Sequence, residues 1–378
     1  MEKQSRIRLL DVLRGFAIIG TLGTNIWLFT HPGDSLSMFI GGDSGNSIFE
    51  NLQSVFINGK FLGLLTILFG IGLELKYRKT LRNQLPWLPV YIWTMAILFM
   101  DGLLHYLFVF DYDILMSYAI TGVIVVFIIR CREKVMARWM RVTAAIHMIG
   151  VLLVTLSMIF VLQDPEFLTM MGHLAAGTAD IYMNGTYLEQ IQYRIIGFGS
   201  LRMEAIAILF MNISLYLFGI RLMRAGAFAS DENGQRIRRK LLYWGVGVGL
   251  PLNLLALVPG GYFEIPVRYL FAPVLSVGYI GVIAWLMEAG VLRWFVKRFE
   301  AIGQTALSCY VLQNIVASIL FYSWGFRLAP ITGAFGTFIA FVGITILMMF
   351  ISELFMKFLG TGPLEWVWRW LSFRPFKK

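Results

Sequence analysis

Ten apolar stretches, each long enough to cross a bilayer, dominate this sequence. A membrane-spanning α-helix needs about 20 mostly apolar residues. Stretches of this kind occupy residues 9–29, 54–75, 87–108, 114–130, 142–162, 200–222, 241–258, 267–290, 301–322 and 333–356. Hydrophobic residues make up 58% of the 378 residues and charged residues only 14%, whereas soluble domains are about 45–50% apolar. We therefore expect an all-α polytopic membrane protein with about ten transmembrane helices.

Lys and Arg residues mark one side of the predicted membrane. They cluster before the first stretch, in alternate connections and after the last stretch, as at Lys76, Arg132 and Arg224. The other connections hold Arg194, Arg327 and little else. Because cytoplasmic loops are enriched in Lys and Arg, this alternation predicts that both termini are cytoplasmic. The Lys and Arg residues behind the net charge of +10 are then expected to orient the chain in the membrane and to contact anionic lipid headgroups. No nucleic-acid partner is expected.

The segments outside the apolar stretches have distinct compositions. Residues 30–50 are rich in Gly, Ser and Asp and contain no Lys or Arg. Residues 163–199 form the longest predicted extracytoplasmic loop and are expected to make a small cap. Residues 363–373 mix Trp with Arg after Pro363, a pattern typical of a helix that lies in the membrane interface. The first stretch lacks a cleavage site and indicates an uncleaved signal anchor.

Two groups of polar residues interrupt the first apolar stretch. Asp11 and Arg14 are three residues apart on one helix face, which favours a local ion pair at the headgroups over a cofactor contact. Asn25 lies near the other end of the stretch, and His31 follows just beyond it. Asn25 is a candidate for helix packing or for holding a substrate or an oxyanion. His31 is a candidate general base, and a loop histidine is the alternative.

The third stretch contains a second candidate base in the segment MDGLLHYLF. Asp101 and His105 are four residues apart, so a carboxylate and an imidazole share one helix face. Such a pair orients the ring and raises its basicity, as in a catalytic dyad, or forms a structural hydrogen bond between helices. Asp111 and Asp113 precede the fourth stretch, where carboxylates suit a helix N-terminus.

Further polar residues lie at membrane depth. His147 has apolar neighbours and is interpreted as a packing residue. Arg202 and Arg268 are able to bind an anionic ligand, although paired structural roles are favoured. Gln313 and Asn314 make the ninth stretch polar along part of its length, which predicts that it faces the interior of the bundle. The sequence contains no P-loop, GxSxG or HExxH motif, and no metal site is expected.

Several motifs resemble the YeiB-like bacterial membrane proteins, a family with a domain of unknown function. The opening RIRLLDVLRGFAIIGTLGTNIWLF is similar to the family's LD-x-LRG-x-A pattern. Further matches are Gly59-Lys60-Phe61 before Ile67-Leu68-Phe69-Gly70, Gly102-Leu103-Leu104-His105 before Tyr112-Asp113-Ile114-Leu115, Gly303-Gln304-Thr305-Ala306-Leu307-Ser308-Cys309-Tyr310, and Gly362-Pro363-Leu364-Glu365-Trp366. These matches run from one end of the chain to the other and place it in the bacterial cytoplasmic membrane.

The resemblance implies a relation to transmembrane acyltransferases such as heparan-α-glucosaminide N-acetyltransferase. Those enzymes take an acyl group from cytosolic acyl-CoA and deliver it across the membrane. The implied donor is acyl-CoA, such as acetyl-CoA, and the implied acceptor is a small molecule, a lipid or a glycan. By resemblance Asn25 and His31 carry the chemistry, at a shorter spacing than in the family. His105 with Asp101 and Asp113 is the rival. For the donor, Asp11 and Arg14 are the candidate cofactor contacts, as the alternative to their local ion pair. A homodimer in the bilayer is one assembly to test, because the sequence does not specify the oligomeric state.

Two other classes of function fit the residues as well. A transporter or exporter of a small metabolite or lipid fits the Gly-rich stretches and intramembrane charges, but transporter folds are usually built from repeats. The only internal echo is Leu68-Phe69-Gly70-Ile71 with Leu217-Phe218-Gly219-Ile220. A non-catalytic scaffold does not need polar residues at membrane depth, which are costly.

Overall fold

The computed structural model describes residues 7–33 and 48–373, and its regular elements there are all helical. In chain order the elements are α1 (Arg8–Thr30), α3 (Ile48–Phe56), α4 (Lys60–Arg82), α5 (Trp87–Phe108), α6 (Leu115–Ile128), α7 (Glu133–Val161), α8 (Pro165–Asn184), α9 (Tyr187–Ile196), α10 (Phe198–Leu201), α11 (Met203–Ala207), α12 (Leu209–Arg224), α13 (Glu232–Asn253), η1 (Leu254–Leu257), α14 (Glu264–Pro266), η2 (Val267–Phe271), α15 (Ala272–Glu288), α16 (Arg293–Gln304), α17 (Ala306–Phe321), η3 (Ala329–Ile331), α18 (Ala334–Leu359) and α19 (Pro363–Phe373).

Within the described residues, seven helices are long and apolar enough to cross a membrane. The pair α16 and α17 makes an eighth if the two helices, bent by 93° at their junction, count as one span. Each of the ten predicted stretches contains helix, but α6 has 14 residues, and α12 and α17 have 16 each. The chain is thus a helical bundle with the character of a multi-pass membrane protein, and ten crossings stay a prediction.

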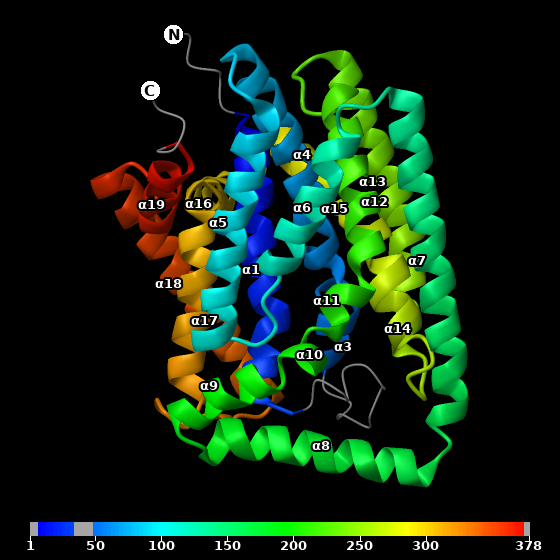
Figure 1. Ribbon diagram of the computed structural model, residues 1–378, viewed down its shortest axis with the longest axis vertical. Helices are drawn as coiled ribbons and strands as arrows, with labels where there is room; N and C mark the ends of the chain where they lie inside the picture. The colour runs from blue at the N-terminus through cyan, green and yellow to red at the C-terminus, as the bar shows by residue number, and fades with distance from the viewer. Residues whose placement is uncertain (1–6, 34–47, 374–378) are drawn as a thin grey trace.

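Basic residues at several helix ends lie at one end of the bundle. Arg82 ends α4, Arg132 precedes α7 and Arg224 ends α12, and these three helix ends lie together with the start of α1 (Figure 1). These basic connections, which the sequence predicts on one side of the membrane, therefore lie at the same end of the bundle. Several of the terminal charges, such as Lys3, Arg6, Arg374, Lys377 and Lys378, lie outside the described residues. The cytoplasmic orientation of this end stays a prediction.

The segment 163–199 is helical rather than an open loop. Helix α8 crosses the end of the bundle opposite the basic residues, roughly at right angles to the long helices (Figure 1). Asp164 accepts a hydrogen bond from the Glu166 backbone N–H and so caps the start of α8. Thr186 and Glu189 form a capping box at the start of α9. These caps fix two helix starts, so the segment covers one end of the bundle as the predicted cap. Part of the Gly-rich connection, residues 34–47, lies outside the described residues.

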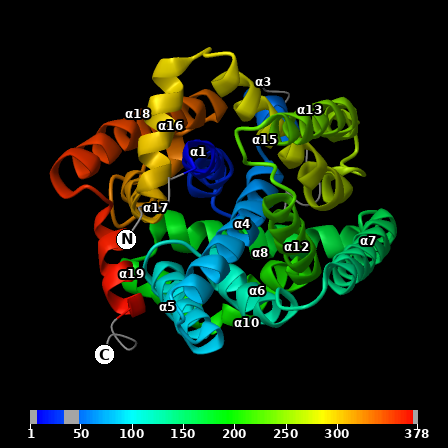
Figure 2. The ribbon, with the colours of Figure 1, turned by 90° about the horizontal axis from the view of Figure 1, so that it is seen from above.

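Helix α19 occupies the predicted position 363–373 and lies at the perimeter beside α5 and α17 (Figure 2). The Glu365 carboxylate accepts hydrogen bonds from the backbone N–H groups of Leu307, at 2.7 Å, and Ser308, at 3.2 Å. A carboxylate at a helix N-terminus satisfies N–H groups that lack partners inside the helix. Glu365 therefore ties α19 to the start of α17. Contact of α19 with a membrane interface stays a prediction.

Helix α1 lies in the middle of the bundle, surrounded by other helices (Figure 2). It crosses α16 at very short range, because a Cβ at Gly15 would stand 1.8 Å from the Phe299 carbonyl oxygen, and one at Gly303 would stand 1.7 Å from the Asp11 carbonyl oxygen. Small residues at crossings let helices approach closely in lipid. In contrast, only 11% of the α7 span and 22% of the α18 span are buried. Their apolar outer faces are the surfaces that suit lipid.

Candidate functional site

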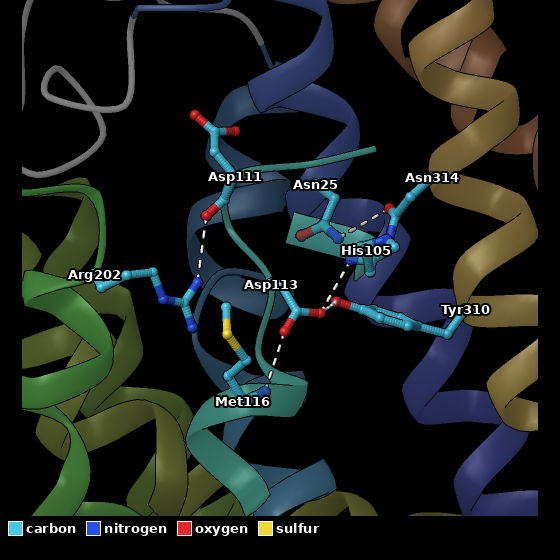
Figure 3. Close-up of polar contacts among 8 residues, drawn as sticks. All are labelled: Asn25, His105, Asp111, Asp113, Met116, Arg202, Tyr310 and Asn314. Atoms are coloured by element: carbon cyan, nitrogen blue, oxygen red, sulfur yellow. Dashed lines mark hydrogen bonds and ion pairs between the residues drawn. The ribbon is translucent and has the colours of Figure 1, made fainter. Parts of the chain in front are cut away.

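The most polar site inside the bundle is built around His105 of α5, which is 3% exposed. Its Nδ1 lies 3.0 Å from Oδ2 of Asp113, and the other Asp113 oxygen accepts from the backbone N–H of Met116 at 3.1 Å (Figure 3). Asp113 is therefore held at the start of α6. An ionised carboxylate only accepts hydrogen bonds, so Nδ1 carries the ring proton and Nε2 keeps its lone pair.

Three more side chains complete this site. The Asn314 amide of α17 donates from Nδ2 to His105 Nε2 at 3.1 Å, and its Oδ1 accepts from Asn25 Nδ2 of α1 at 3.1 Å (Figure 3). The Tyr310 hydroxyl donates to Asp113 Oδ2 at 3.4 Å. We call Asn25, His105, Asp113, Tyr310 and Asn314 the His105 cluster. All five side chains are buried, and they come from α1, α5, α17 and the start of α6.

The structure gives His105 a carboxylate partner other than the one its helix spacing suggests. Asp101 shares a helix face with His105, yet the carboxylate at hydrogen-bond distance belongs to Asp113. Spacing along a helix fixes only that two side chains lie on the same side. The direction of the ring nitrogens depends on neighbouring helices, and here the α5–α6 turn places Asp113 against Nδ1. Asp101 is half-buried nearby.

His31 and Asn25, paired by the family resemblance, are separated in the structure. Asn25 belongs to the His105 cluster, whereas His31 lies at the C-terminal end of α1. His31 Nδ1 is 2.9 Å from Thr30 Oγ1, and the ring stacks on Trp27 with 5.8 Å between centroids. Six residues correspond to about 9 Å along a helix. The histidine that Asn25 reaches, through Asn314, is therefore His105.

Asp11 and Arg14 form the predicted local ion pair, with 3.2 Å between Arg14 Nη1 and Asp11 Oδ1. Arg14 also lines the largest cavity near the His105 cluster, which has a volume of about 400 Å³. This cavity opens between α1, α4, α5 and α17. Its wall is mostly apolar, and Lys76 and Arg369 join Arg14 as its cations. A cofactor contact of Arg14 stays a prediction.

A smaller cavity of about 70 Å³ lies toward the α8 end of the bundle. We call it the Arg202 cavity. Asn25 and Asp113 line it, together with Arg202. Tyr310 lines the larger cavity of about 400 Å³, and Ile114 lines both. The His105 cluster is therefore the polar partition between two cavities at different depths of the bundle.

Sequence reasoning did not assign Tyr310 and Asn314 to the candidate site. A local signal for them exists, because the two residues are four apart in the polar ninth stretch and so share a helix face. Their contact partners lie about 200 positions away in the sequence, which no local pattern reveals. Within the described ranges, no group of three or more His, Cys, Asp or Glu side chains is arranged to hold a metal ion.

The chain is similar to known proteins over nearly its whole length. Residues 222–375 match the family described as "Protein of unknown function (DUF418)". The chain is 24% identical to uncharacterized protein YxaH of Bacillus subtilis (strain 168), over 99% of this chain and 96% of that protein. It is also 24% identical to uncharacterized protein YeiB of Escherichia coli (strain K12), over 97% of this chain and 96% of that protein.

No solved structure matches the chain. The matches are to uncharacterized proteins, so the implied relation to acyltransferases stays a prediction. The family resemblance itself is confirmed, since the relatives align from one end of the chain to the other and the family model covers its C-terminal part. The C-terminal part of the chain thus matches the DUF418 family model, and the whole chain is similar to YeiB and YxaH.

Proposed function

We propose that this chain transfers an acyl group from cytosolic acyl-CoA to an acceptor that enters from the opposite side of the membrane. The observation that carries the proposal is the position of the His105 cluster. An imidazole with its Nδ1 bonded to Asp113 stands between two cavities, one lined by Tyr310 and the other by Asp113 itself. His105 lines neither cavity, so a donor on one side and an acceptor on the other would reach its Nε2 only after the Asn314 amide moves away.

The larger cavity, of about 400 Å³, suits an acyl-CoA, and we call it the donor-side cavity. Its apolar wall, formed by residues such as Leu65, Leu98 and Leu115, fits an acyl chain and the pantetheine arm. Lys76 and Arg369 lie at the end of the bundle that holds the basic helix termini, where they offer cations to the phosphates of CoA. The Lys76 ammonium also stands 5.0 Å from the centre of the Trp368 ring. The polar end of the donor would therefore face the predicted cytoplasm.

The chemistry follows from the state of His105. Nε2 takes the proton of an acceptor hydroxyl or amine as that group attacks the thioester carbonyl carbon. The carbon–sulfur bond then breaks, and the departing CoA sulfur receives the proton from Nε2. Asp113 stabilises the imidazolium that forms between these steps, and the amide N–H groups of Asn25 or Asn314 stabilise the oxyanion. Asn314 must leave Nε2 when the acceptor arrives.

The test is release of CoA by the purified protein in lipid nanodiscs supplied with acetyl-CoA and longer acyl-CoAs. We expect release to collapse in His105→Ala and to persist in His31→Ala, which removes the histidine outside the cluster. Because a missing acceptor can silence transfer, thermal stabilisation by acyl-CoA is measured in parallel. Neither release nor stabilisation for any acyl-CoA would contradict the proposal, as would full release in His105→Ala.

Transport is the second candidate, favoured by one specific observation. The helices beside the two cavities are broken, at Arg202 and Ile208 before α12 and at the 93° bend between α16 and α17. Discontinuous helices around a midplane site are common in transporters. Uptake of a solute into proteoliposomes without consumption of acyl-CoA would favour this function over transfer.

A further inference from the structure

Arg202 is a buried cation with incomplete pairing. The side chain is 8% exposed, and among the described residues it donates one long hydrogen bond, from Nη1 to the Asp111 carbonyl oxygen at 3.4 Å (Figure 3). Nη2 is buried without a hydrogen-bond partner among the described residues. The guanidinium also lies over the Tyr106 ring, 5.4 Å from its centre. Leaving a buried charge with so few partners is costly, and such residues in membrane proteins commonly mark ligand sites.

The backbone around Arg202 is broken where it lines the Arg202 cavity. Helix α10 ends at Leu201, Arg202 adopts φ −99° and ψ 2°, and α11 starts at Met203. Leu201, Glu204, Ala205 and Ile208 line the same cavity. Irregular backbone at membrane depth is tolerated where it is buried in protein or lines a polar cavity. The break therefore places the guanidinium at the wall of the cavity instead of in a continuous helix.

The neighbouring charges leave Arg202 as the available cation. Arg268, the other arginine of the cavity wall, has its Nη2 bonded to Glu204 at 2.9 Å and its Nη1 bonded to Asn58 at 2.8 Å. Asp113 is bonded to His105. Thr21 and Ser117 add hydroxyl groups to the wall. The wall thus combines Arg202, whose Nη2 has no hydrogen-bond partner among the described residues, with neutral hydroxyl groups. Its two carboxylates, Asp113 and Glu204, are already bonded to His105 and Arg268.

We propose that the Arg202 cavity binds the anionic group, a carboxylate or a phosphate, of a ligand that enters from the α8 end of the bundle. A guanidinium binds both groups through charge-assisted hydrogen bonds and matches their planar or tetrahedral oxygens. The cavity volume of about 70 Å³ suits one such group rather than a whole metabolite. This site stands independently of acyl transfer. If transfer occurs, it anchors the acceptor in the cavity that Asn25 and Asp113 also line.

Anion binding is measured without any acyl donor. A negative result would therefore count against the anion site and not against acyl transfer. Full-length protein in phosphatidylcholine nanodiscs is titrated with inorganic phosphate and with acetate, at constant ionic strength, and Tm is followed. The variant is Arg202→Gln. The matched control is Arg327→Gln, which removes an exposed cation near the same end of the bundle. We expect Tm to rise with one of the anions in the wild type and in Arg327→Gln. Arg202→Gln should bind roughly 10- to 100-fold more weakly.

Two additional measurements keep the result interpretable. The Tm of Arg202→Gln without anion should equal or exceed that of the wild type, because the substitution removes a poorly paired buried charge. A clear fall in that Tm, together with unchanged anion binding, would assign Arg202 a purely structural role and overturn the proposal. Arg202→Lys keeps the charge and should retain part of the affinity. Anion effects of equal size in the wild type and in Arg202→Gln would also overturn it.

The ligand group has two sources, a soluble anion or a lipid headgroup. Nanodiscs containing phosphatidylglycerol and no free phosphate distinguish them. Stabilisation in those discs that depends on Arg202 assigns the site to a lipid phosphate, and stabilisation by inorganic phosphate or acetate alone assigns it to a soluble anion. Absence of an Arg202-dependent effect in every arm would refute the site.

Discussion

Asp113 Oδ2 lies 3.0 Å from His105 Nδ1, and both side chains are almost completely shielded, at 0% and 1% exposed. The two residues are eight positions apart and join the end of α5 to the start of α6. Because the backbone N–H of Met116 holds the other carboxylate oxygen, Asp113 cannot turn away without losing a second hydrogen bond. The imidazole is therefore fixed in one tautomer and one orientation.

This relationship predicts the effect of Asp113→Asn. An amide in place of the carboxylate cannot stabilise the imidazolium, so we expect acyl transfer to fall by about 10²- to 10⁴-fold, the usual contribution of a positioned acid–base group. The measurement is the rate of CoA release in nanodiscs. Asp101→Asn is the matched control, since it removes the carboxylate four residues from His105 and should change the rate by much less. A larger loss in Asp101→Asn than in Asp113→Asn would show that the pairing is wrong.

A second prediction concerns the donor-side cavity. Gly72 lines it, and the nearest atom to an added Cβ is Arg14 Nη2 at 4.0 Å, so a large side chain there enters the cavity without a backbone clash. Gly72→Phe should therefore abolish thermal stabilisation by acyl-CoA while leaving the unliganded Tm close to that of the wild type. Gly150→Phe on α7, where a Cβ has no neighbour within 4 Å, serves as the control. Unchanged acyl-CoA binding in Gly72→Phe would place the donor elsewhere.

A third prediction concerns the crossing of α1 and α16. Gly303→Ala would put a methyl group 1.7 Å from the Asp11 carbonyl oxygen, so the helices must separate. Overpacking of this kind costs about 1–3 kcal/mol. We expect a lower Tm in nanodiscs and, because α1 carries Asn25, weaker activity. Gly343→Ala on the exposed face of α18 has open space around it and should leave Tm unchanged. Equal stability of the two variants would contradict the close approach.

A fourth prediction concerns pH. Burial raises the pKa of the Asp111 carboxyl, and the Arg194 charge and a hydrogen bond from Tyr182 offset this only in part. A carboxyl group with a raised pKa in the folded protein stabilises it at low pH, and this contribution is lost as pH rises through that pKa. Tm should therefore decline as pH rises above about 4, the usual pKa of Asp.

Asp111→Asn should flatten this decline, as measured by Tm between acidic and neutral pH. Asp180→Asn removes an exposed carboxylate from α8 and should keep the wild-type profile. The same pH dependence in Asp111→Asn and the wild type would assign the decline to other groups.

Part of this architecture follows from local sequence patterns. Apolar stretches of spanning length predicted helices at all ten positions, and the Lys and Arg clusters predicted which helix ends lie together. The Pro363 segment predicted a final helix. These features depend on residues close in sequence, through helical periodicity and the cost of burying charge. For the same reason Asn25, His105 and Asp113 stood out as polar residues in apolar surroundings. The number of crossings does not follow from these patterns, because α6, α12 and α17 are short.

The sequence by itself therefore determined a helical, membrane-type chain and a short list of chemically able residues. Only the tertiary structure decided which of them meet. It joined His105 to Asp113 and to Asn314, which is 209 positions away, and placed His31 at the end of α1. It also left Arg202 with a buried, unpartnered nitrogen at a cavity. The physical reason is that spacing along one helix fixes a face, whereas contacts between helices depend on close crossings such as the one at Gly15 and Gly303.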